Sequence, residues 1–273
     1  MGAVPRRTSS PQRRPTVPSS QVIKMNWTDN HCHLPDDLNA AMQVVEDAKE
    51  MGVHRLIDVG TSVIRSGQCI SRAEHLDGVW ATAGVHPHDA KDGIEGLKEL
   101  LLHPKTVAVG ECGLDYYYDN SPRDTQKIVF AQQIQLAHQF KLPLVIHTRD
   151  AWSDTFDLLD KEGMPPKTVF HCFTGGPDEA TAAIERGAYL SFSGIVTFPS
   201  APELRAAAAL TPANRYMVET DAPYLAPVPK RGKQNRPGWV TLVGEGVAEA
   251  RGVKLADVAT ETWNNAENFY GLT

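Results

Sequence analysis

The stretch Asp29-Asn30-His31-Cys32-His33 closes the first of eight short apolar, β-rich runs in this chain of 273 residues. Residues two apart in an extended segment point to the same side, so His31 and His33 can face one metal ion while Cys32 points away into packing. The other seven runs are residues 53–59, 79–85, 106–110, 143–147, 168–171, 188–193 and 216–219.

Helix-like segments separate these runs. Residues 37–51 repeat apolar side chains near the helical period, and Gly52 follows as a C-terminal cap. Residues 125–140 and 178–186 have the same character. Eight short strands, most followed by a helix, predict an α/β fold of the (β/α)8 TIM-barrel type. The alternative is a doubly wound open sheet, but the Gly-rich first turn that usually marks a nucleotide-binding sheet is absent.

The first 24 residues differ in composition from the rest. They hold five cations and no acid among many Pro and Ser residues, which predicts a disordered basic tail at residues 1–24 before a single barrel domain at residues 25–273. No apolar stretch follows the arginine pairs, so a signal peptide is not predicted. No run is long enough to span a bilayer, and we expect no contact with a membrane.

Charge limits the function of the body. The chain carries −6 and its tail +5, which leaves −11 for residues 25–273. A body this acidic is not a general nucleic-acid binder held by a basic surface. If it handles nucleic acid, metal cations and a local basic patch must offset the repulsion.

The four cysteines, Cys32, Cys69, Cys112 and Cys172, form no close pair along the chain. This spacing predicts free thiols in a reducing cytoplasm rather than a disulfide framework. Strand alternation points the cysteines beside candidate ligands away from the site, so we interpret them as small buried residues rather than thiolate ligands.

Further metal-ligand residue types stand at the ends of later runs. Four of the ten histidines and two carboxylates occupy such positions: His31, His33, Glu111, His147, His171 and Asp221. The carboxyl ends of barrel strands converge on one rim, where active sites lie. Six N and O ligands exceed one tetrahedral ion and suit a pair of divalent ions. Glu111 has two oxygens and can bridge such a pair.

Neighbouring residues have expected supporting roles. His86 and His88, at the third strand end, could be ligands, substrate contacts or supports for a ligand. Because seven or eight ligands would be too many, we predict that they contact substrate or support a ligand. Asp29 is expected to support the ligands in the same way. Asp115 follows Glu111 and either orients a ligand, lines the pocket or simply packs.

A basic loop follows Asp221. Four cations fall within residues 230–236, which in an acidic body indicates a patch for an anionic substrate. Arg231 and Lys233 are predicted phosphate contacts, and Arg149, beside His147, is a third.

Together these segments resemble the TatD family of metal-dependent deoxyribonucleases, from about residue 26 to the C-terminus. The matching segments are Asp29–His33, Gly84–His88, Gly110–Tyr116, Ile146–Arg149, His171–Gly175, Glu219–Leu225, Arg231–Asn235 and Asn264–Leu272. Arg236 departs from the pattern, because the family often has an acidic or amide residue before Pro237.

The resemblance implies a (β/α)8 barrel, two divalent ions and hydrolysis of nucleic-acid phosphodiesters, often from a 3′ end. We expect His31, His33, Glu111 and Asp221 to hold one ion, and Glu111, His147 and His171 the other. Asp221 and Glu111 are the predicted catalytic residues, with Asp221 accepting a proton from the attacking water. Single-stranded DNA is the expected substrate, with RNA as a further one. Zinc, magnesium and manganese all remain candidates, since the Irving–Williams order favours zinc but magnesium is abundant.

Two other functions stay open at this point. One is an amidohydrolase-like esterase or amidase, including cleavage of an aminoacyl-tRNA ester. Such enzymes often bridge their metals with a carbamylated lysine, whereas the fourth strand offers Glu111. The other is a non-catalytic barrel that binds nucleic acid, which the complete ligand set argues against. The oligomeric state is open, a monomer included.

Overall fold

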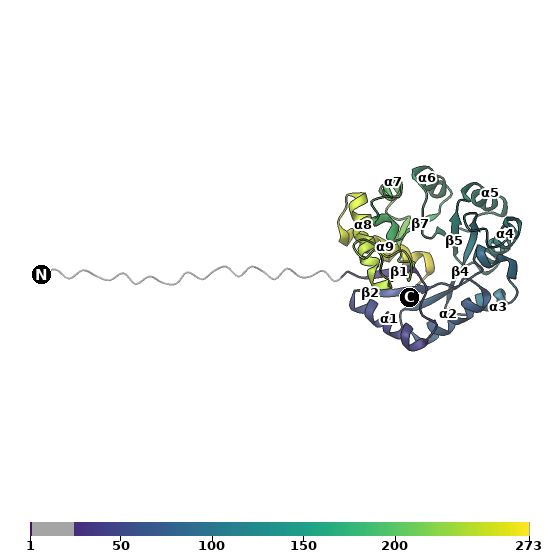
Figure 1. The fold of residues 1–273 in the computed structure, drawn as a ribbon, viewed down its shortest axis with the longest axis horizontal. Coiled ribbons are helices and arrows are strands. Elements are labelled where there is room, and N and C mark those ends of the chain that lie inside the picture. The colour runs from purple at the N-terminus through teal and green to yellow at the C-terminus, as the bar shows by residue number, and fades with distance from the viewer. Residues whose placement is uncertain (2–24, 273) are drawn as a thin grey trace.

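The computed structural model describes Met1 and residues 25–272. The predicted disordered tail lies outside these residues apart from Met1. Eight parallel strands in the order β1 to β8 form one sheet, ringed by helices (Figure 1). The strands are β1 (Trp27–Cys32), β2 (Val53–Asp58), β3 (Val79–Ala83), β4 (Thr106–Asp115), β5 (Leu144–Arg149), β6 (Thr168–Phe170), β7 (Tyr189–Phe192) and β8 (Tyr216–Val218).

Contacts between β8 and β1 close the sheet. Asn30 Nδ2 donates to Val218 O at 2.8 Å, and the Asp221 amide donates to His31 O at 2.9 Å. The His33 amide then donates to Ala222 O at 2.8 Å. The predicted (β/α)8 TIM barrel is therefore confirmed, and the open sheet is excluded.

The helices fill the connections between successive strands. They are α1 (Leu38–Glu50), α2 (Val63–His75), α3 (Leu97–Leu101), α4 (Arg123–Phe140), α5 (Trp152–Glu162), α6 (Pro177–Glu185), α7 (Pro202–Leu210), α8 (Val240–Arg251) and α9 (Leu255–Tyr270). Three short 3-10 helices accompany them: η1 (Pro87–Asp92), η2 (Gly194–Thr197) and η3 (Pro237–Trp239). The predicted helices match α1, α4 and α6 to within about two residues, an ordinary uncertainty at helix ends.

Strand alternation divides the core into two layers. Leu56, Ile146 and Phe170 belong to the large cluster that packs against the helices. Their chain neighbours Ile57, Val145 and Val169 belong to a second cluster with Phe269 and Tyr270 of α9. Successive side chains of a strand point to opposite faces, so one face of these strands packs in the large cluster and the other packs with the end of α9.

The fourth strand is longer than predicted, since β4 continues past Gly110 to Asp115. Gly110 and Gly113 make this possible. Both have positive φ, and a Cβ on Gly110 would meet the Val145 carbonyl oxygen at 2.6 Å. Without side chains at these positions, β4 stays paired with β5 as far as Asp115 and Arg149. Glu111 therefore lies within a strand rather than after one.

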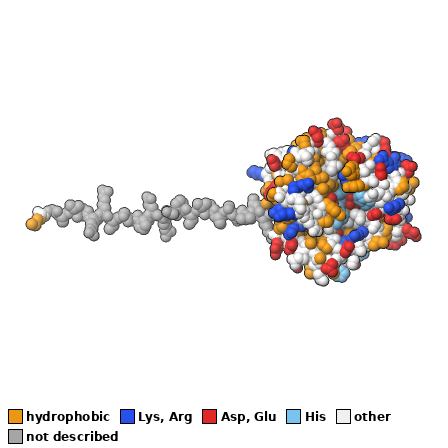
Figure 2. Space-filling model, in the orientation of Figure 1, with side chains coloured by type: hydrophobic (Ala, Val, Ile, Leu, Met, Phe, Trp, Pro, Cys, Tyr) orange, Lys and Arg blue, Asp and Glu red, His pale blue; other side chains and the backbone are white. Residues whose placement is uncertain are grey.

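In the part of the chain that the structure describes, no helix is long and apolar enough to cross a membrane. Figure 2 shows acidic and basic side chains interspersed over the face in view.

Candidate metal centre

The structure brings together all six side chains predicted as ligands. His31 lies in β1, Glu111 in β4 and His147 in β5. His33 and His171 directly follow β1 and β6, and Asp221 lies three residues past the end of β8. These segments lie at the carboxyl ends of the strands, which converge at one end of the barrel. Residues up to 190 positions apart in the chain thereby become neighbours.

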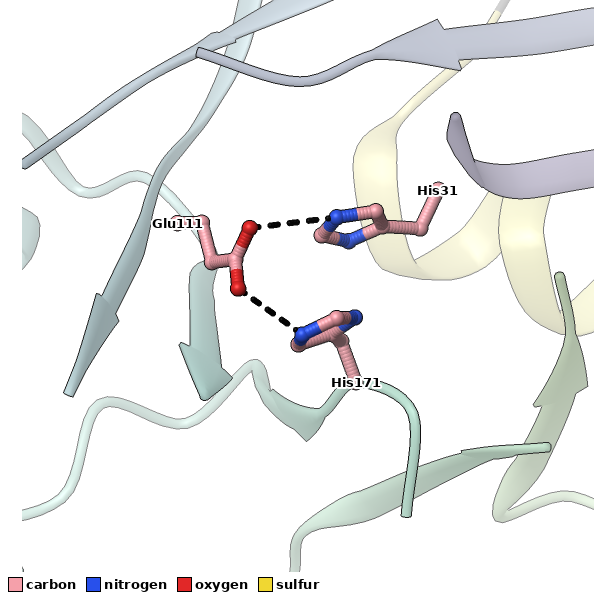
Figure 3. A group of neighbouring side chains, drawn as sticks. All are labelled: His31, Glu111 and His171. Atoms are coloured by element: carbon pink, nitrogen blue, oxygen red, sulfur yellow. Dashed lines mark ion pairs between the residues drawn. The ribbon is translucent and has the colours of Figure 1, made fainter. Parts of the chain in front are cut away.

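Glu111 stands at the centre of the cluster, and its two oxygens face different groups (Figure 3). Glu111 Oε2 lies 3.3 Å from His31 Nε2, and Oε1 lies 2.9 Å from His171 Nε2. Oε1 also lies 3.1 Å from His147 Nδ1. A carboxylate placed in this way can bridge two cations, one at each oxygen.

On the Oε2 side of Glu111, Asp221 lies close to His31 in β1 and to His33 just after β1. Asp221 Oδ1 lies 3.8 Å from His31 Nε2 and 3.6 Å from His33 Nε2. These three side chains form one group of donor atoms close enough for a common ion. With Glu111 Oε2 they are the four donors expected for a first ion.

On the Oε1 side, His147 Nδ1 and His171 Nε2 lie 3.4 Å apart. With the two distances to Glu111 Oε1 they form a compact triangle, the set expected for a second ion. His86 Nε2 also lies 3.3 Å from Glu111 Oε1. His86 therefore offers a further donor on this side, a ligand role that the sequence left open but that was set aside in favour of substrate contact or support.

The donor set fits divalent ions. Two ligands of a tetrahedral ion with bonds of about 2.1 Å lie about 3.4 Å apart, close to the distances found here. His31 supplies a second observation. Its side chain is fully buried, yet neither ring nitrogen has a hydrogen-bond partner among the described residues. Burying a polar group without a hydrogen bond is costly, so a cation between His31 Nε2 and Glu111 Oε2 would satisfy an atom that makes no hydrogen bond in the protein.

The charges of the cluster depend on one another. Burial alone would raise the pKa of Glu111, but His171, His86 and His31 hold that pKa well below its usual value. Asp221 likewise has a lowered pKa, because His33 and His31 outweigh the effect of burial. Burial lowers the pKa of His86 to about 4. Ionised carboxylates beside a neutral imidazole are the protonation states that metal binding requires.

Two residues at the strand ends have left-handed backbone conformations. Asp221 has φ of 54° and Cys172, which follows His171, has φ of 41°. Aspartate tolerates this region better than most residues. Such conformations persist where the surrounding structure enforces them, and they cluster at functional sites.

Glu219 is a functional candidate that the sequence analysis missed. It is fully buried, and its Oε1 faces His171 Nδ1 at 3.2 Å and accepts from the Cys172 amide at 2.7 Å. A carboxylate on the second nitrogen of a ligand histidine fixes the ring and raises its basicity. Its position two residues before Asp221, at a strand end, was the available signal.

Asp115 and Asp29 have comparable places. Asp115 Oδ2 lies 3.0 Å from Nε2 of both His88 and His147, so it orients these rings rather than Glu111. Asp29 accepts from the backbone amides of Thr220 at 2.8 Å and His31 at 3.3 Å. Asp29 therefore ties together the two strand ends that carry ligands.

A cavity of about 1350 Å³ opens over the cluster. Of the three cations predicted to contact phosphate, Arg149 lines it, whereas Arg231 and Lys233 are exposed and lie outside its lining. The guanidinium of Arg231 instead stacks on Phe198, 3.8 Å from the ring centroid. Arg236, from the same loop, does line the cavity.

The comparisons with known proteins agree with this geometry. The model of the family described as TatD related DNase matches residues 28–271. The chain belongs to the TatD family.

Among its relatives is "Uncharacterized metal-dependent hydrolase YabD" of Bacillus subtilis, 39% identical over 254 residues, which are 89% of this chain and 98% of the relative. "3'-5' ssDNA/RNA exonuclease TatD" of Escherichia fergusonii is 35% identical over 241 residues, 84% of this chain and 92% of the relative. The crystal structure of YJJV, a TatD homologue from Escherichia coli K12, superposes with a TM-score of 0.86 at 25% identity and covers 92% of this chain and all of that one. This TatD chain is thus a metal-dependent hydrolase by family.

Proposed function

We propose that this TatD protein hydrolyses phosphodiester bonds of nucleic acids, acting on single-stranded DNA from the 3′ end and also on RNA. The observation that carries the proposal is Glu111, whose Oε2 faces His31 and whose Oε1 faces His171 and His147. The name of the Escherichia fergusonii relative supports the substrate class and polarity.

Two divalent ions, when bound, supply the Lewis acidity that activates a water and balances charge on the phosphate. His31, His33, Glu111 and Asp221 would hold one of them, and Glu111, His147 and His171 the other. His86 would add a donor beside the second, since its lowered pKa keeps the imidazole neutral at pH 7. The donor set fits zinc, manganese and magnesium, with zinc the tightest.

Asp221 is the proposed proton acceptor. It lies at the edge of the cluster, where 14% of its side chain is exposed, and its lowered pKa keeps the carboxylate ionised. Glu219 is fully buried and does not line the cavity, so it cannot reach a water there. Geometry thus favours Asp221 for accepting the proton from the attacking water.

The cavity supplies the remaining contacts. Arg149 lines it and makes no ion pair within the described residues, so it is available for a phosphate. His88 also lines it and remains a proposed substrate contact, held by Asp115. Arg231 and Lys233 remain candidate phosphate contacts for a nucleic-acid strand that leaves the cavity across their loop. The four cysteines are all free, which supports the cytoplasmic location that we include in the proposal.

One assay tests the proposal. Metal-loaded protein is incubated with labelled single-stranded DNA, duplex DNA, RNA and a panel of small esters, with and without chelator. We expect cleavage of single-stranded DNA from its 3′ end, which is lost with chelator and restored by divalent ions. Ester cleavage alone, or binding of DNA without turnover, would overturn the proposal in favour of an amidohydrolase-like esterase or a binding protein.

A further inference from the structure

One wall of the cavity, beside β1 and β8, carries an exposed aromatic ring. Tyr224 is 61% exposed and lines the cavity. Its ring centroid lies 6.3 Å from that of His33, with an interplanar angle of 67°. Tyr224 is therefore a direct neighbour of the metal cluster whose large apolar surface is open to the cavity.

The ring of Tyr118 also lines the cavity, but the Arg149 guanidinium already covers it and the neighbouring ring of Tyr117. Arg149 lies 3.9 Å from the ring centroid of Tyr117 and 4.9 Å from that of Tyr118. Tyr118 in addition contacts the edge of His88. No cation covers Tyr224 anywhere in the described part of the chain. Of these three tyrosines, only Tyr224 thus presents a ring without a stacked partner.

A cation stands on the same wall as Tyr224. Arg236 lines the cavity, and its guanidinium lies 5.1 Å from the ring centroid of Trp239. It takes part in no ion pair within residues 25–272, unlike Arg65 and Arg72, which also line the cavity but are paired with Asp36 and Asp58. Arg236 is thus free to bind an anion.

A buried amide fixes Tyr224 and Arg236 relative to each other. Asn235 is only 4% exposed. Its Nδ2 donates to Tyr224 O at 2.6 Å and to Thr220 O at 2.8 Å, and its Oδ1 accepts from the Arg236 amide at 2.9 Å. The backbone of both residues is therefore anchored to the end of β8, which carries Asp221.

We propose that Tyr224 and Arg236 form a nucleotide subsite beside the metal cluster, in which a base stacks on Tyr224 and Arg236 binds an adjacent phosphate. This subsite rests on the proposed nuclease function. An aromatic face next to a cation is the arrangement by which proteins bind single-stranded nucleic acid. Because a base must leave its duplex stack to lie on Tyr224, the subsite also gives the enzyme a preference for single strands.

The first test compares two substrates in four metal-loaded variants: Tyr224→Ala, Tyr224→Phe, Arg236→Ala and the control Lys254→Ala. Lys254 is an exposed cation outside the cavity lining. Tyr224→Ala should raise KM for a single-stranded DNA oligonucleotide about tenfold, the scale of one base–aromatic stack. Methyl p-nitrophenyl phosphate, which has no base, should be hydrolysed as by the parent. Tyr224→Phe keeps the ring and should behave like the parent, as should Lys254→Ala.

The second test needs no turnover. The fluorescence of 2-aminopurine deoxyriboside 5′-monophosphate is quenched when its base stacks on an aromatic ring. The parent and Tyr224→Phe should quench the probe on binding, and Tyr224→Ala should bind without quenching. Arg236→Ala should keep the quenching at saturation but need about tenfold more protein to reach it, the scale of one hydrogen bond to a charged group.

The outcomes separate the subsite from the nuclease function. Equal KM values and equal quenching in Tyr224→Ala and the parent would overturn the subsite while leaving the nuclease function intact. Absence of phosphodiester hydrolysis with Tyr224-dependent quenching would overturn the nuclease function but support the subsite. A parent protein that does not quench the probe would also overturn the subsite.

Discussion

Two buried ionic groups lie at the cavity end of this barrel, and they neutralise their charge differently. Asp58 at the end of β2 accepts from Arg72 Nε at 2.7 Å and from the Leu34 amide at 3.1 Å. Glu111 and Asp221 instead face imidazoles. The guanidinium of Arg72 is permanently charged, whereas an imidazole exchanges its proton for a metal ion. The first group is therefore suited to hold the fold, and the second to bind a cation.

The largest expected effect comes from Glu111 and Asp221, which we call the imidazole-faced group. Asp221→Asn removes the charge of a proposed ligand and proton acceptor while keeping its shape. We expect hydrolysis to fall by about a thousandfold or more, the combined scale of a lost metal charge and a lost general base. Glu111→Ala should have the same effect.

Steady-state kinetics and thermal unfolding check this prediction together. Both variants should unfold cooperatively near the parent temperature in the metal-free form. The control Asp178→Asn changes an exposed carboxylate on α6 and should cleave DNA like the parent. Cleavage of DNA by Glu111→Ala at the parent rate would refute the ligand assignment.

Breaking the buried Asp58–Arg72 pair should instead lower the stability of the fold and leave metal binding unchanged. Arg72→Met leaves the fully buried Asp58 carboxylate without its partner. Breaking a buried ion pair from one side typically costs about 3–5 kcal/mol, so the free energy of unfolding should fall by that amount. Metal content should not change.

Denaturant unfolding measures the first quantity and elemental analysis the second. Arg65→Met is the matched control, because Arg65 is half exposed and its pair with Asp36 lies at the surface; its effect should stay below about 1 kcal/mol. An Arg72→Met protein as stable as the parent would show that the Asp58–Arg72 pair does not stabilise the fold.

A smaller effect is expected at Glu219, which supports the imidazole-faced group from behind. Glu219→Gln keeps an acceptor for the Cys172 amide but loses the charge that faces His171 Nδ1. Loss of such a partner typically weakens metal binding about 10- to 100-fold. Competition with a chromophoric chelator measures this affinity, and Glu267→Gln on α9 is the control. If Glu219→Gln and Glu267→Gln bind metal equally well, the Glu219 charge does not strengthen metal binding through His171.

The smallest effect is on the pH dependence of the metal-free protein. The pKa of His171 is raised because Glu111 and Glu219 outweigh burial, and that of His33 is raised because of Asp221. A histidine with a raised folded pKa stabilises the fold below its unfolded value of about 6.5, and this stability is lost as pH rises through the folded pKa.

Thermal unfolding of chelator-treated protein should therefore occur at lower temperature as pH rises above about 6.5. The metal-loaded protein should not follow this trend, since metal binding requires neutral histidines. The Asp58–Arg72 pair adds nothing to it, because guanidinium does not titrate in this range. A metal-free protein that gains stability with rising pH would contradict the assigned pairing.

The sequence was sufficient to predict the barrel because each strand and helix has its own local signal. Alternating apolar runs and helix caps act over a few residues, and the predicted strands agree with β1 to β8 except at the end of β4. That end depends on Gly110 and Gly113, whose close approach to β5 is a tertiary contact. No local pattern reports it.

The site was predictable to the extent that strand ends converge. The convergence of His31, Glu111 and Asp221 follows from the topology alone. The places of His86 beside Glu111, Glu219 behind His171 and Arg231 on Phe198 depend on side-chain direction within the folded barrel. Spacing along the chain cannot give that direction, which is why Arg231 was predicted as a phosphate contact and Arg236 was noted only as a departure from the family pattern.

The central proposal is that Glu111 would bridge two ions, and elemental analysis of metal per chain in the parent and in Glu111→Gln tests it most directly. After loading and removal of excess ion, we expect two divalent ions per parent chain. In Glu111→Gln we expect one ion or fewer, because the amide cannot bridge as a charged ligand. A parent chain that holds a single ion, or a Glu111→Gln chain that still holds two, would contradict the account.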